Sequence, residues 1–437
     1  MQILHNLEAE EIVIGCILKD YHYLDEIDLK PEEFYSSKLE LIYKTMLEMY
    51  SKLEPITFIT LSNKLPEFTT DIARLAGSVP TSVYIKTYAE IVRVKAQLRQ
   101  IQKTGERIQQ LPQTDHESTD ELISQAEKMV YDLSVNRASG DIVHIGQALT
   151  EYSDMVDAAN KNGSKITGVD TGYYKINYKT SGLQVQDLII LGARPSMGKT
   201  AFALNIAENT AIRQKLPTAI FSLEMSRKKL AMRMIASESR IDTQKLKLLN
   251  LTPDETRRYT KSYEGIEKSP LFIDDTPGIS AMEILSKSRR IKKKHGLRLV
   301  IIDYLGLMAG HKGVSRYESV SENTRILKNV ARELDCPVLC LAQLSRGVEQ
   351  RDNKRPMLSD LRETGEIEQT SDMVWFLYRD EYYNKNSPDK GISELIIAKQ
   401  RDGPTGTINL KWFEQFTKFE NLDHEMGKVI EGGWPGE

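Results

Sequence analysis

The stretch Asp187–Gln214, DLIILGARPSMGKTAFALNIAENTAIRQ, decides the fold class of this chain. Four apolar residues, Leu188 to Leu191, have the length and β-branched content expected of a buried parallel strand. A loop follows and ends in Gly198-Lys199-Thr200, after which apolar residues recur at helical spacing. Strand, loop and helix in this order predict the phosphate-binding loop of a nucleoside triphosphatase.

The residue types in this loop suit a bound triphosphate. Backbone N–H groups at a helix N-terminus point at phosphate oxygens, and Gly198 lets the backbone approach without a Cβ. Lys199 would reach the β- and γ-phosphates, and the Thr200 hydroxyl would bind Mg²⁺. We therefore predict that ATP contacts a continuous run of residues: Ala193, Arg194, Pro195, Ser196, Met197, Gly198, Lys199, Thr200 and Ala201.

The loop departs from the strict pattern at one position. A glycine is expected six residues before Lys199, where this chain has Ala193. Gly192 comes one residue too early to replace it. Because an alanine fits there if its φ angle is negative, we interpret the loop as a variant of the pattern.

Composition indicates a globular protein of two or three domains. The chain has 437 residues, of which 40% are hydrophobic and 28% charged. The net charge of −3 excludes a generally basic surface, so any nucleic-acid site must be local. Three scattered cysteines indicate a reducing cytoplasm rather than a disulfide framework or zinc site. The sequence predicts neither a signal peptide nor a membrane span.

Residues 1–135 predict an all-α domain. Asn6 can cap a first helix whose opening turn is acidic. From Ile85 apolar residues step by threes and fours in near-heptad register, and a second such stripe begins at Leu122 after a break. Two helices of this kind form a hairpin. It either packs on its own domain or provides a self-association surface.

Two further regions follow the helical domain. Residues 136–166 predict a linker with one amphipathic helix near Ile145–Ala159, whose apolar face must pack on its own domain or on a neighbouring subunit. From 167 to 437 strands and helices alternate, which predicts an α/β domain with a largely parallel sheet. The closing segments Thr407–Trp412 and Phe416–Glu420 predict a hairpin.

Polar residues follow several predicted strands, where open α/β sheets bind their ligands. Asp303 is either a water-mediated partner of Mg²⁺ or a simple cap. Glu224 either deprotonates the attacking water or caps the helix that starts near Ser226. Gln343 either senses the γ-phosphate or satisfies a loop.

Two later segments carry concentrated positive charge. Lys399 and Arg401 end a strand in a tight turn, where they are either solvated or reach across a subunit boundary as an arginine finger. A long polar stretch predicts contact with a nucleic-acid backbone through its cations, with few aromatic residues for base stacking. These cations are Arg346, Arg351, Lys354, Arg355 and Arg362.

Taken together, the motifs resemble the DnaB family of replicative DNA helicases, bacterial or phage-encoded. Ala193 is shared with that family. The matching stretches run along nearly the whole chain: HNLEAEEIVIGCIL (5–18), LIILGARPSMGKTAFALNIA (188–207), FSLEM (221–225), LVIIDYLGLM (299–308), LAQLSRGVEQR (341–351), RPMLSDLRETGEIEQTSD (355–372) and AKQRDGPTG (398–406).

The resemblance implies a homohexameric ring. Each subunit would have a helical N-terminal domain with a hairpin, a linker helix docked on the adjacent subunit, and a RecA-like P-loop motor domain. Hydrolysis of ATP would drive 5′ to 3′ translocation on single-stranded DNA and unwinding of forked duplex in the cytoplasm, or the host cytoplasm for a phage protein. A primase and a helicase loader are implied as partners, and no membrane.

Matching positions in the ATP site carry the family's roles. Lys199 and Thr200 would bind phosphate and Mg²⁺, and Asp303 would be the acid on the metal side. Glu224 would be the catalytic carboxylate. Gln343 resembles the glutamine that couples hydrolysis to movement.

The remaining roles lie outside the subunit's own ATP site. Lys399 and Arg401 would act in trans on the ATP of a neighbouring subunit. Arg362, Glu363 and Gly365 would lie in the loop that grips the DNA backbone, partly through main-chain N–H groups.

Two other classes fit parts of the sequence. A RecA-like strand-exchange recombinase shares the motor fold, but the N-terminal hairpin and linker helix argue against it. An ATP-regulated scaffold that binds DNA or primase without unwinding is disfavoured, because Lys199, Glu224 and Arg401 form a hydrolytic set that a scaffold does not need.

Overall fold

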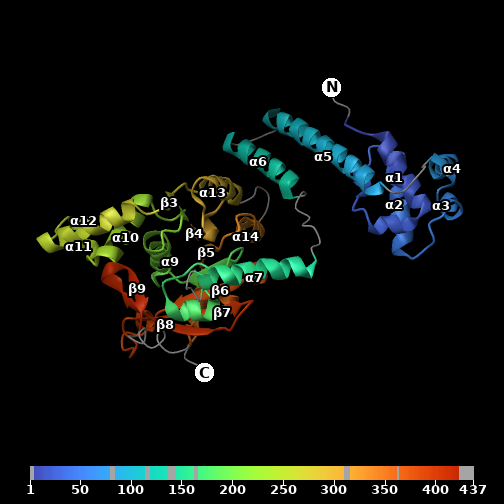
Figure 1. Ribbon diagram of the computed structural model, residues 1–437. Coiled ribbons are helices and arrows are strands. Elements are labelled where there is room, and N and C mark those ends of the chain that lie inside the picture. Colours follow the sequence, from blue (N-terminus) through green and yellow to red (C-terminus); the bar gives the residue numbers. More distant parts are fainter. Residues whose placement is uncertain are drawn as a thin grey trace. The chain divides into compact units, whose positions relative to one another are not determined.

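The computed structural model describes residues 4–78, 84–113, 119–135, 144–161, 166–309, 315–361 and 364–422 (Figure 1). The chain divides into two compact units, Met1–Asp141 and Ile142–Glu437. Within the described ranges, no helix has the length and apolar character needed to cross a membrane.

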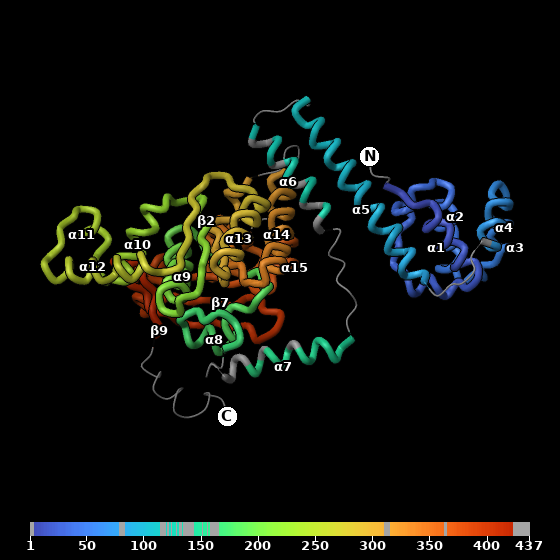
Figure 2. The backbone as a smooth tube through the Cα atoms, turned by 45° about the horizontal axis from the view of Figure 1, so that its top comes forward, coloured from blue at the N-terminus to red at the C-terminus, as the bar shows by residue number. Residues whose placement is uncertain are grey.

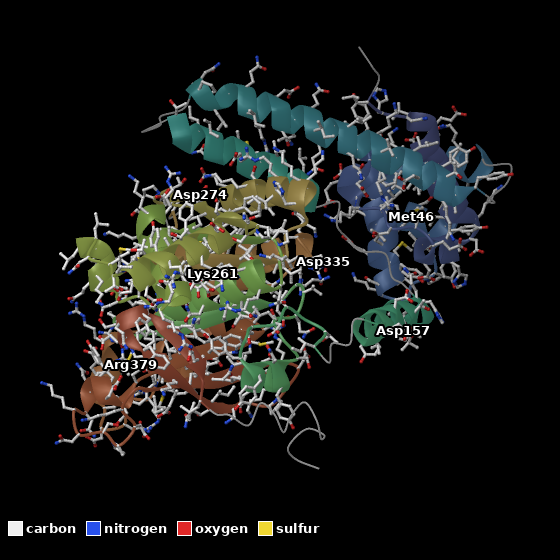
Figure 3. The ribbon with its side chains drawn as sticks, turned by 60° about the vertical axis from the view of Figure 1, so that its left-hand side comes forward. Met46, Asp157, Lys261, Asp274, Asp335 and Arg379 are labelled. Carbon is white, nitrogen blue, oxygen red and sulfur yellow. The ribbon has the colours of Figure 1, made fainter. Side chains whose placement is uncertain are left out.

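The first unit is helical, as predicted. Asn6 caps the first helix by accepting a hydrogen bond from the Ala9 N–H at 3.0 Å. Apolar side chains from the helices meet in one core, where Met46 is fully buried (Figure 3). The helices are α1 (Leu7–Lys19), α2 (Ser37–Ser51), α3 (Phe58–Lys64), α4 (Thr69–Ser78), α5 (Ile85–Gln110) and α6 (Thr119–Val135).

The last two of these helices form the predicted hairpin. Helices α5 and α6 contact one another and run side by side (Figure 2). Only the first turns of α5 join the core of the unit, through Ile85, Ala89 and Val92. Farther along, Ile101 on α5 and Val130 on α6 are about half exposed. The hairpin therefore extends beyond the core and leaves apolar side chains uncovered.

Among the described residues of the second unit, nine strands form one sheet in the order β3-β2-β4-β5-β1-β6-β7-β8-β9. Neighbours from β3 to β6 are parallel, and the last four strands pair antiparallel, including the predicted hairpin β8–β9. The strands are β1 (Leu188–Ala193), β2 (Thr218–Ser222), β3 (Leu271–Asp274), β4 (Leu299–Asp303), β5 (Val338–Gln343), β6 (Met373–Tyr378), β7 (Ile392–Gln400), β8 (Gly406–Phe413) and β9 (Lys418–Asn421).

Helices cover both faces of the parallel strands. Alternate strand residues such as Ile189 and Leu191 join α9 in the main core, while α13 contacts β2 and α14 contacts β1 and β5. The described helices of the second unit, including those away from the sheet, are α7 (Ile145–Lys161), α8 (Tyr174–Thr180), α9 (Lys199–Glu208), α10 (Arg227–Ser239), α11 (Thr243–Leu248), α12 (Pro253–Glu267), α13 (Ala281–His295), α14 (Arg316–Glu333), α15 (Thr364–Thr370) and α16 (Asp380–Tyr383).

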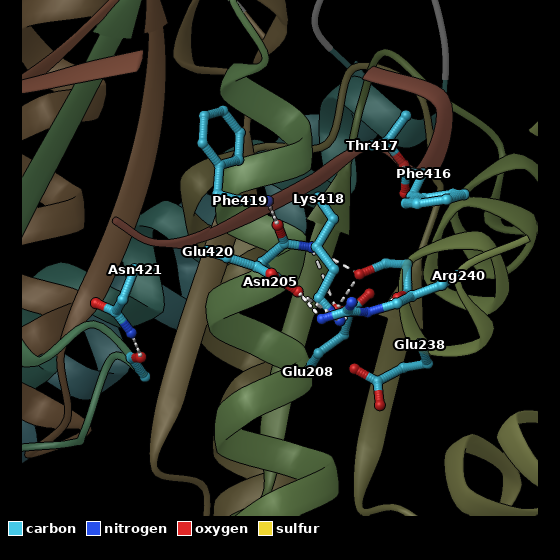
Figure 4. Close-up of polar contacts among 12 residues, drawn as sticks. Asn205, Glu208, Glu238, Arg240, Phe416, Thr417, Lys418, Phe419, Glu420 and Asn421 are labelled. Carbon is cyan, nitrogen blue, oxygen red and sulfur yellow. Dashed lines mark hydrogen bonds and ion pairs between the residues drawn. The ribbon is translucent and has the colours of Figure 1, made fainter. Parts of the chain in front are cut away.

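The last residue of α9 is a buried glutamate. Glu208 is 1% exposed and accepts hydrogen bonds from the Ser237 hydroxyl (2.7 Å) and the Asn205 amide (3.2 Å), while its Oε1 has no partner among the described residues (Figure 4). Burial is the main cause that raises the pKa of Glu208 to about 8, and the nearby Glu238 carboxylate is the second. Between about pH 4.5 and pH 8, Glu208 therefore holds a proton in the folded protein that it releases in the unfolded chain.

Substituting Glu208 with glutamine is expected to stabilise the protein most at high pH. Because the pKa of Glu208 is raised in the folded state, wild-type stability falls as the pH rises from about 4.5 towards 8. Between pH 5 and pH 8 the stability of the Glu208→Gln variant relative to the wild type should rise by about 3 kcal/mol. Urea unfolding at both pH values measures this. An equal gap at pH 5 and pH 8, or a similar trend in the exposed control Glu264→Gln, would contradict the assignment.

Candidate active site

The carboxyl ends of the parallel strands meet at one edge of the sheet, which we call the carboxyl edge. Ala193 at the end of β1 pairs with Gln343 at the end of β5. Asp303 at the end of β4 pairs with Ser222 at the end of β2, and Glu224 follows two residues later. Four strands thus bring the phosphate-binding loop and the predicted polar residues to one edge.

The phosphate-binding loop has the backbone that its sequence requires. Gly198 has a φ of +93° and is the N-cap of α9, so α9 begins at Lys199. Ala193 is the last residue of a buried strand, where extended backbone accepts any side chain. A Cβ on Gly192 would lie 2.9 Å from atoms of Leu344 and Phe376. Position 192 therefore requires a glycine for packing against Leu344 and Phe376, whereas position 193 does not require one.

Two arginines fix the loop from outside. Arg194 donates to the Leu344 carbonyl (2.8 Å) and forms an ion pair with Glu349 (2.8 Å). Arg379, which follows β6, donates to the Ser196 carbonyl at 3.3 Å. Ser196 itself has a positive φ of +67°. These contacts fix the backbone of the loop against the segments that follow β5 and β6.

Lys199 and Thr200 both face Asp303. The Thr200 hydroxyl donates to Asp303 Oδ2 at 2.7 Å, and the Lys199 ammonium lies 3.8 Å from Asp303 Oδ1. The ammonium also lies 4.4 Å from the centre of the Tyr304 ring, a cation–π contact that the sequence did not predict. Burial lowers the pKa of Lys199, and the Asp303 and Glu224 carboxylates oppose that shift. A triphosphate would stabilise this ammonium further.

The donor set at Asp303 fits a hard divalent cation. Asp303 is 2% exposed, and its Oδ1 has no hydrogen-bond partner among the described residues. A buried carboxylate oxygen that makes no hydrogen bond to the described residues, beside the Thr200 hydroxyl, supplies the oxygen ligands that Mg²⁺ prefers.

Glu224 does not cap the helix that follows it. The N-cap of α10 is Ser226, and Glu224 is exposed at the carboxyl edge. Arg233, on α10, lies close enough to Glu224 and Asp303 for both carboxylates to raise its pKa, although burial lowers that pKa overall. Arg233 was not predicted from the sequence. Helical spacing places it on α10, but only the sheet order brings α10 to Asp303.

Lys399 and Arg401 lie at the opposite edge of the sheet. Strand β7 runs antiparallel to β6, so Gln400 at its end pairs with Met373 at the start of β6. Met373 in turn pairs with Ile189, near the start of β1. The structure therefore does not bring these two cations to the phosphate-binding loop of their own chain.

The predicted DNA loop is described only in part. Arg362 and Glu363 lie outside the described residues, whereas Gly365 is exposed in the first turn of α15. Two cations of the basic stretch are already paired: Arg351 with Asp360 and Arg355 with Glu394, each at 2.6 Å. Arg355 anchors the stretch to β7, and the Arg351 pair closes a contact within the stretch, functions that charge counting alone does not show.

Comparison with known proteins places this site in a family. The model of the DnaB-like helicase C terminal domain matches residues 168–421, which contain the whole carboxyl edge, and that of the N terminal domain matches residues 2–94. The chain belongs to the DnaB-like helicase family. The predicted fold class, a helical domain before an α/β motor, is confirmed. ATP-dependent DNA helicase, the predicted enzyme class, is that of this family.

Full-length relatives support the DnaB assignment. The chain is 42% identical to the replicative DNA helicase DnaB of Geobacillus stearothermophilus, covering 97% of this chain and 96% of that one. It is also 42% identical to the replicative DNA helicase DnaC of Bacillus subtilis, with 96% and 95% covered.

Solved structures agree with the sequence relatives. A DnaB-like replicative helicase, studied with its interactions with primase, has a TM-score of 0.74 at 35% identity over 96% of this chain and 100% of that one. A second solved structure, of an ATPase domain on its own, has a TM-score of 0.62 at 41% identity, over 65% of this chain and 100% of that domain.

Proposed function

We propose that this chain is one subunit of a homohexameric ring that translocates 5′ to 3′ on single-stranded DNA and unwinds the replication fork. One observation supports an ATP site shared between copies: Arg401 and the phosphate-binding loop lie at opposite edges of the sheet. The six residues of β1 lie between Arg401 and the loop. At about 3.3 Å per residue this strand is about 20 Å long. No arginine side chain spans that distance, so an Arg401 that acts on ATP would act on the ATP of another copy.

Within each shared site the residues divide the work. Backbone N–H groups of Arg194 and of residues 196–199, together with the Lys199 ammonium, would hold the phosphates. Thr200 and Asp303 would hold Mg²⁺, which neutralises charge on the phosphate oxygens when bound. Glu224 would orient the attacking water and accept its proton, while Gln343 senses the γ-phosphate. Arg401 and Lys399 of the adjacent copy would stabilise charge that develops during transfer.

The helix α7 supports contact between copies. Its residues Ile145, Leu149 and Tyr152, at helical spacing, are each at least 60% exposed. Three apolar side chains on one helical face favour a covered position, and an adjacent subunit would provide it. We retain the division into a helical domain (1–135), a linker (136–166) and a motor (167–437).

Partners follow from the same assignment. Single-stranded DNA would contact Arg362, Glu363 and Gly365 in the centre of the ring. Primase fits as a partner because a related DnaB-like helicase has been solved with its interactions with primase. A loader would place the ring on DNA in the cytoplasm, or in the host cytoplasm for a phage protein.

Strand displacement on forked duplexes tests this function. Unwinding is expected to need ATP, Mg²⁺ and a free 5′ single-stranded tail, and to stop when that tail alone is blocked. A block on the 3′ tail is the control and should leave unwinding intact. Hydrolysis without displacement would favour the scaffold, and filaments rather than closed rings in negative-stain images would favour the recombinase.

A further inference from the structure

Asp372, just before β6, joins the phosphate-loop strand to the predicted trans-acting arginine. The residue is 6% exposed. Its Oδ2 accepts the Leu188 N–H at the start of β1 (2.8 Å) and the Lys328 ammonium of α14 (2.5 Å). Its other oxygen, Oδ1, lies 3.4 Å from the Arg401 guanidinium. One carboxylate oxygen thus binds the fixed frame of the domain, and the other faces Arg401.

The C-terminal end of α15 holds the same cations from a second side. Arg401 Nη2 donates to the Gln369 carbonyl at 2.6 Å. Lys399 Nζ donates to the carbonyls of Glu368 and Ser371. Free carbonyls at a helix C-terminus attract cations through their partial negative charge. Both cations are therefore anchored at the C-terminal end of α15, the helix that begins in the predicted DNA loop.

An arginine that acts across a boundary needs such anchoring. The Arg401 side chain is 45% exposed, and a long side chain that is otherwise free loses rotamer entropy when it is fixed. A guanidinium carries five N–H donors. In Arg401, Nη1 faces Asp372 and Nη2 donates to the Gln369 carbonyl, and each contact uses one acceptor oxygen. Donors remain for a phosphate while the group stays oriented.

We propose that Asp372 is a positioning residue for Arg401, which it holds in the orientation that acts on the nucleotide of the adjacent subunit. The inference rests on the proposed trans site. A simpler role for Asp372 is to fix the start of β1, which the Oδ2 contacts alone would fulfil. The contact of Oδ1 with Arg401 goes beyond that role and predicts an effect in the neighbour's site rather than in its own.

Asparagine at position 372 separates the two roles. Its carbonyl oxygen can still accept from Leu188 and Lys328, while its amide presents a donor to the Arg401 guanidinium in place of an acceptor. We expect Asp372→Asn rings to hydrolyse ATP with a kcat about ten-fold lower and an unchanged Kd for ATP. Glu255→Gln, which also neutralises a buried carboxylate paired with a lysine, is the matched control and should leave kcat unchanged.

Mixed rings show where the effect acts. A Lys199→Ala subunit, the donor, still supplies Arg401 but cannot bind ATP productively. An Arg401→Ala subunit, the acceptor, binds ATP but supplies no arginine. Hydrolysis is then expected only where the phosphate-binding loop of an acceptor meets Arg401 of a donor. Adding Asp372→Asn to the donor should lower this hydrolysis about ten-fold. Adding it to the acceptor should leave the rate unchanged.

Other patterns of rate loss overturn the positioning role. The positioning role is wrong if the rate falls only when Asp372→Asn is in the acceptor, falls equally in both cases, or does not fall at all. A simple mixture of Lys199→Ala and Arg401→Ala subunits without any hydrolysis instead overturns the proposed trans site, and this inference with it. Thermal unfolding monitors folding of each variant. If Asp372→Asn does not fold, Asp372→Glu, which displaces the carboxylate by one methylene, replaces it in the same donor and acceptor tests with the same expected asymmetry.

Discussion

Replacing Arg401 with alanine is expected to reduce ATP hydrolysis at least about a thousand-fold, the scale of an arginine finger. The loss should fall on kcat and leave the Kd for ATP unchanged, because the phosphate-binding loop of each subunit is intact. Titration with a fluorescent ATP analogue measures binding, and release of phosphate measures turnover. Arg240→Ala is the matched control, since that arginine is also exposed and ion-paired, but with Glu420, away from Asp372.

Mixing variants gives this prediction its direction. Rings that combine Arg401→Ala with Lys199→Ala subunits should regain hydrolysis, because some sites then have an intact loop from one copy and an intact arginine from the next. The regained rate should peak at an intermediate ratio. Failure to regain any activity at every ratio would show that Arg401 does not act in trans.

Replacing Glu224 with glutamine is expected to lower kcat about a hundred- to ten-thousand-fold, the range attributed to a positioned general base. Glutamine keeps the size of the side chain and its ability to orient water, but it cannot accept a proton. Binding of ATP should persist, because Glu224 is exposed and follows β2, outside the loop that holds the phosphates. Single-turnover hydrolysis separates the chemical step from product release.

The control for this experiment is Glu264→Gln, an exposed glutamate on α12 far along the chain from the carboxyl edge. Its turnover should equal that of the wild type. If Glu224→Gln hydrolyses ATP at more than about a tenth of the wild-type rate, another group activates the water and the assignment of Glu224 is wrong.

Sequence patterns sufficed for features that depend on short stretches of chain. The apolar run before Gly192 and the Gly-Lys-Thr after it specify β1, the loop and α9 together, and the structure has all three. Asp303 could be placed at a strand end because four apolar residues precede it. In each case local periodicity and one polar residue carry the information.

Other features depend on residues that meet only in the folded chain. The need for glycine at Gly192 comes from Leu344 and Phe376, which are more than a hundred residues away. The antiparallel joins from β6 to β8 set which edge carries Arg401, and no pattern within β7 reveals its direction. The sequences of helices α11 and α12 are mostly polar, so apolar periodicity does not reveal them, although Pro253 and the Thr252–Glu255 capping box mark the start of α12.

The distance between Arg401 and its own phosphate-binding loop has a consequence for measured rates. With Arg401 acting in trans as proposed, a subunit on its own would lack part of its active site, and its turnover would be reduced at least about a thousand-fold. Specific activity must then rise with protein concentration until assembly is complete, and dilution must inactivate the enzyme reversibly. A specific activity quoted without the protein concentration therefore describes the assembly equilibrium as much as the chemistry.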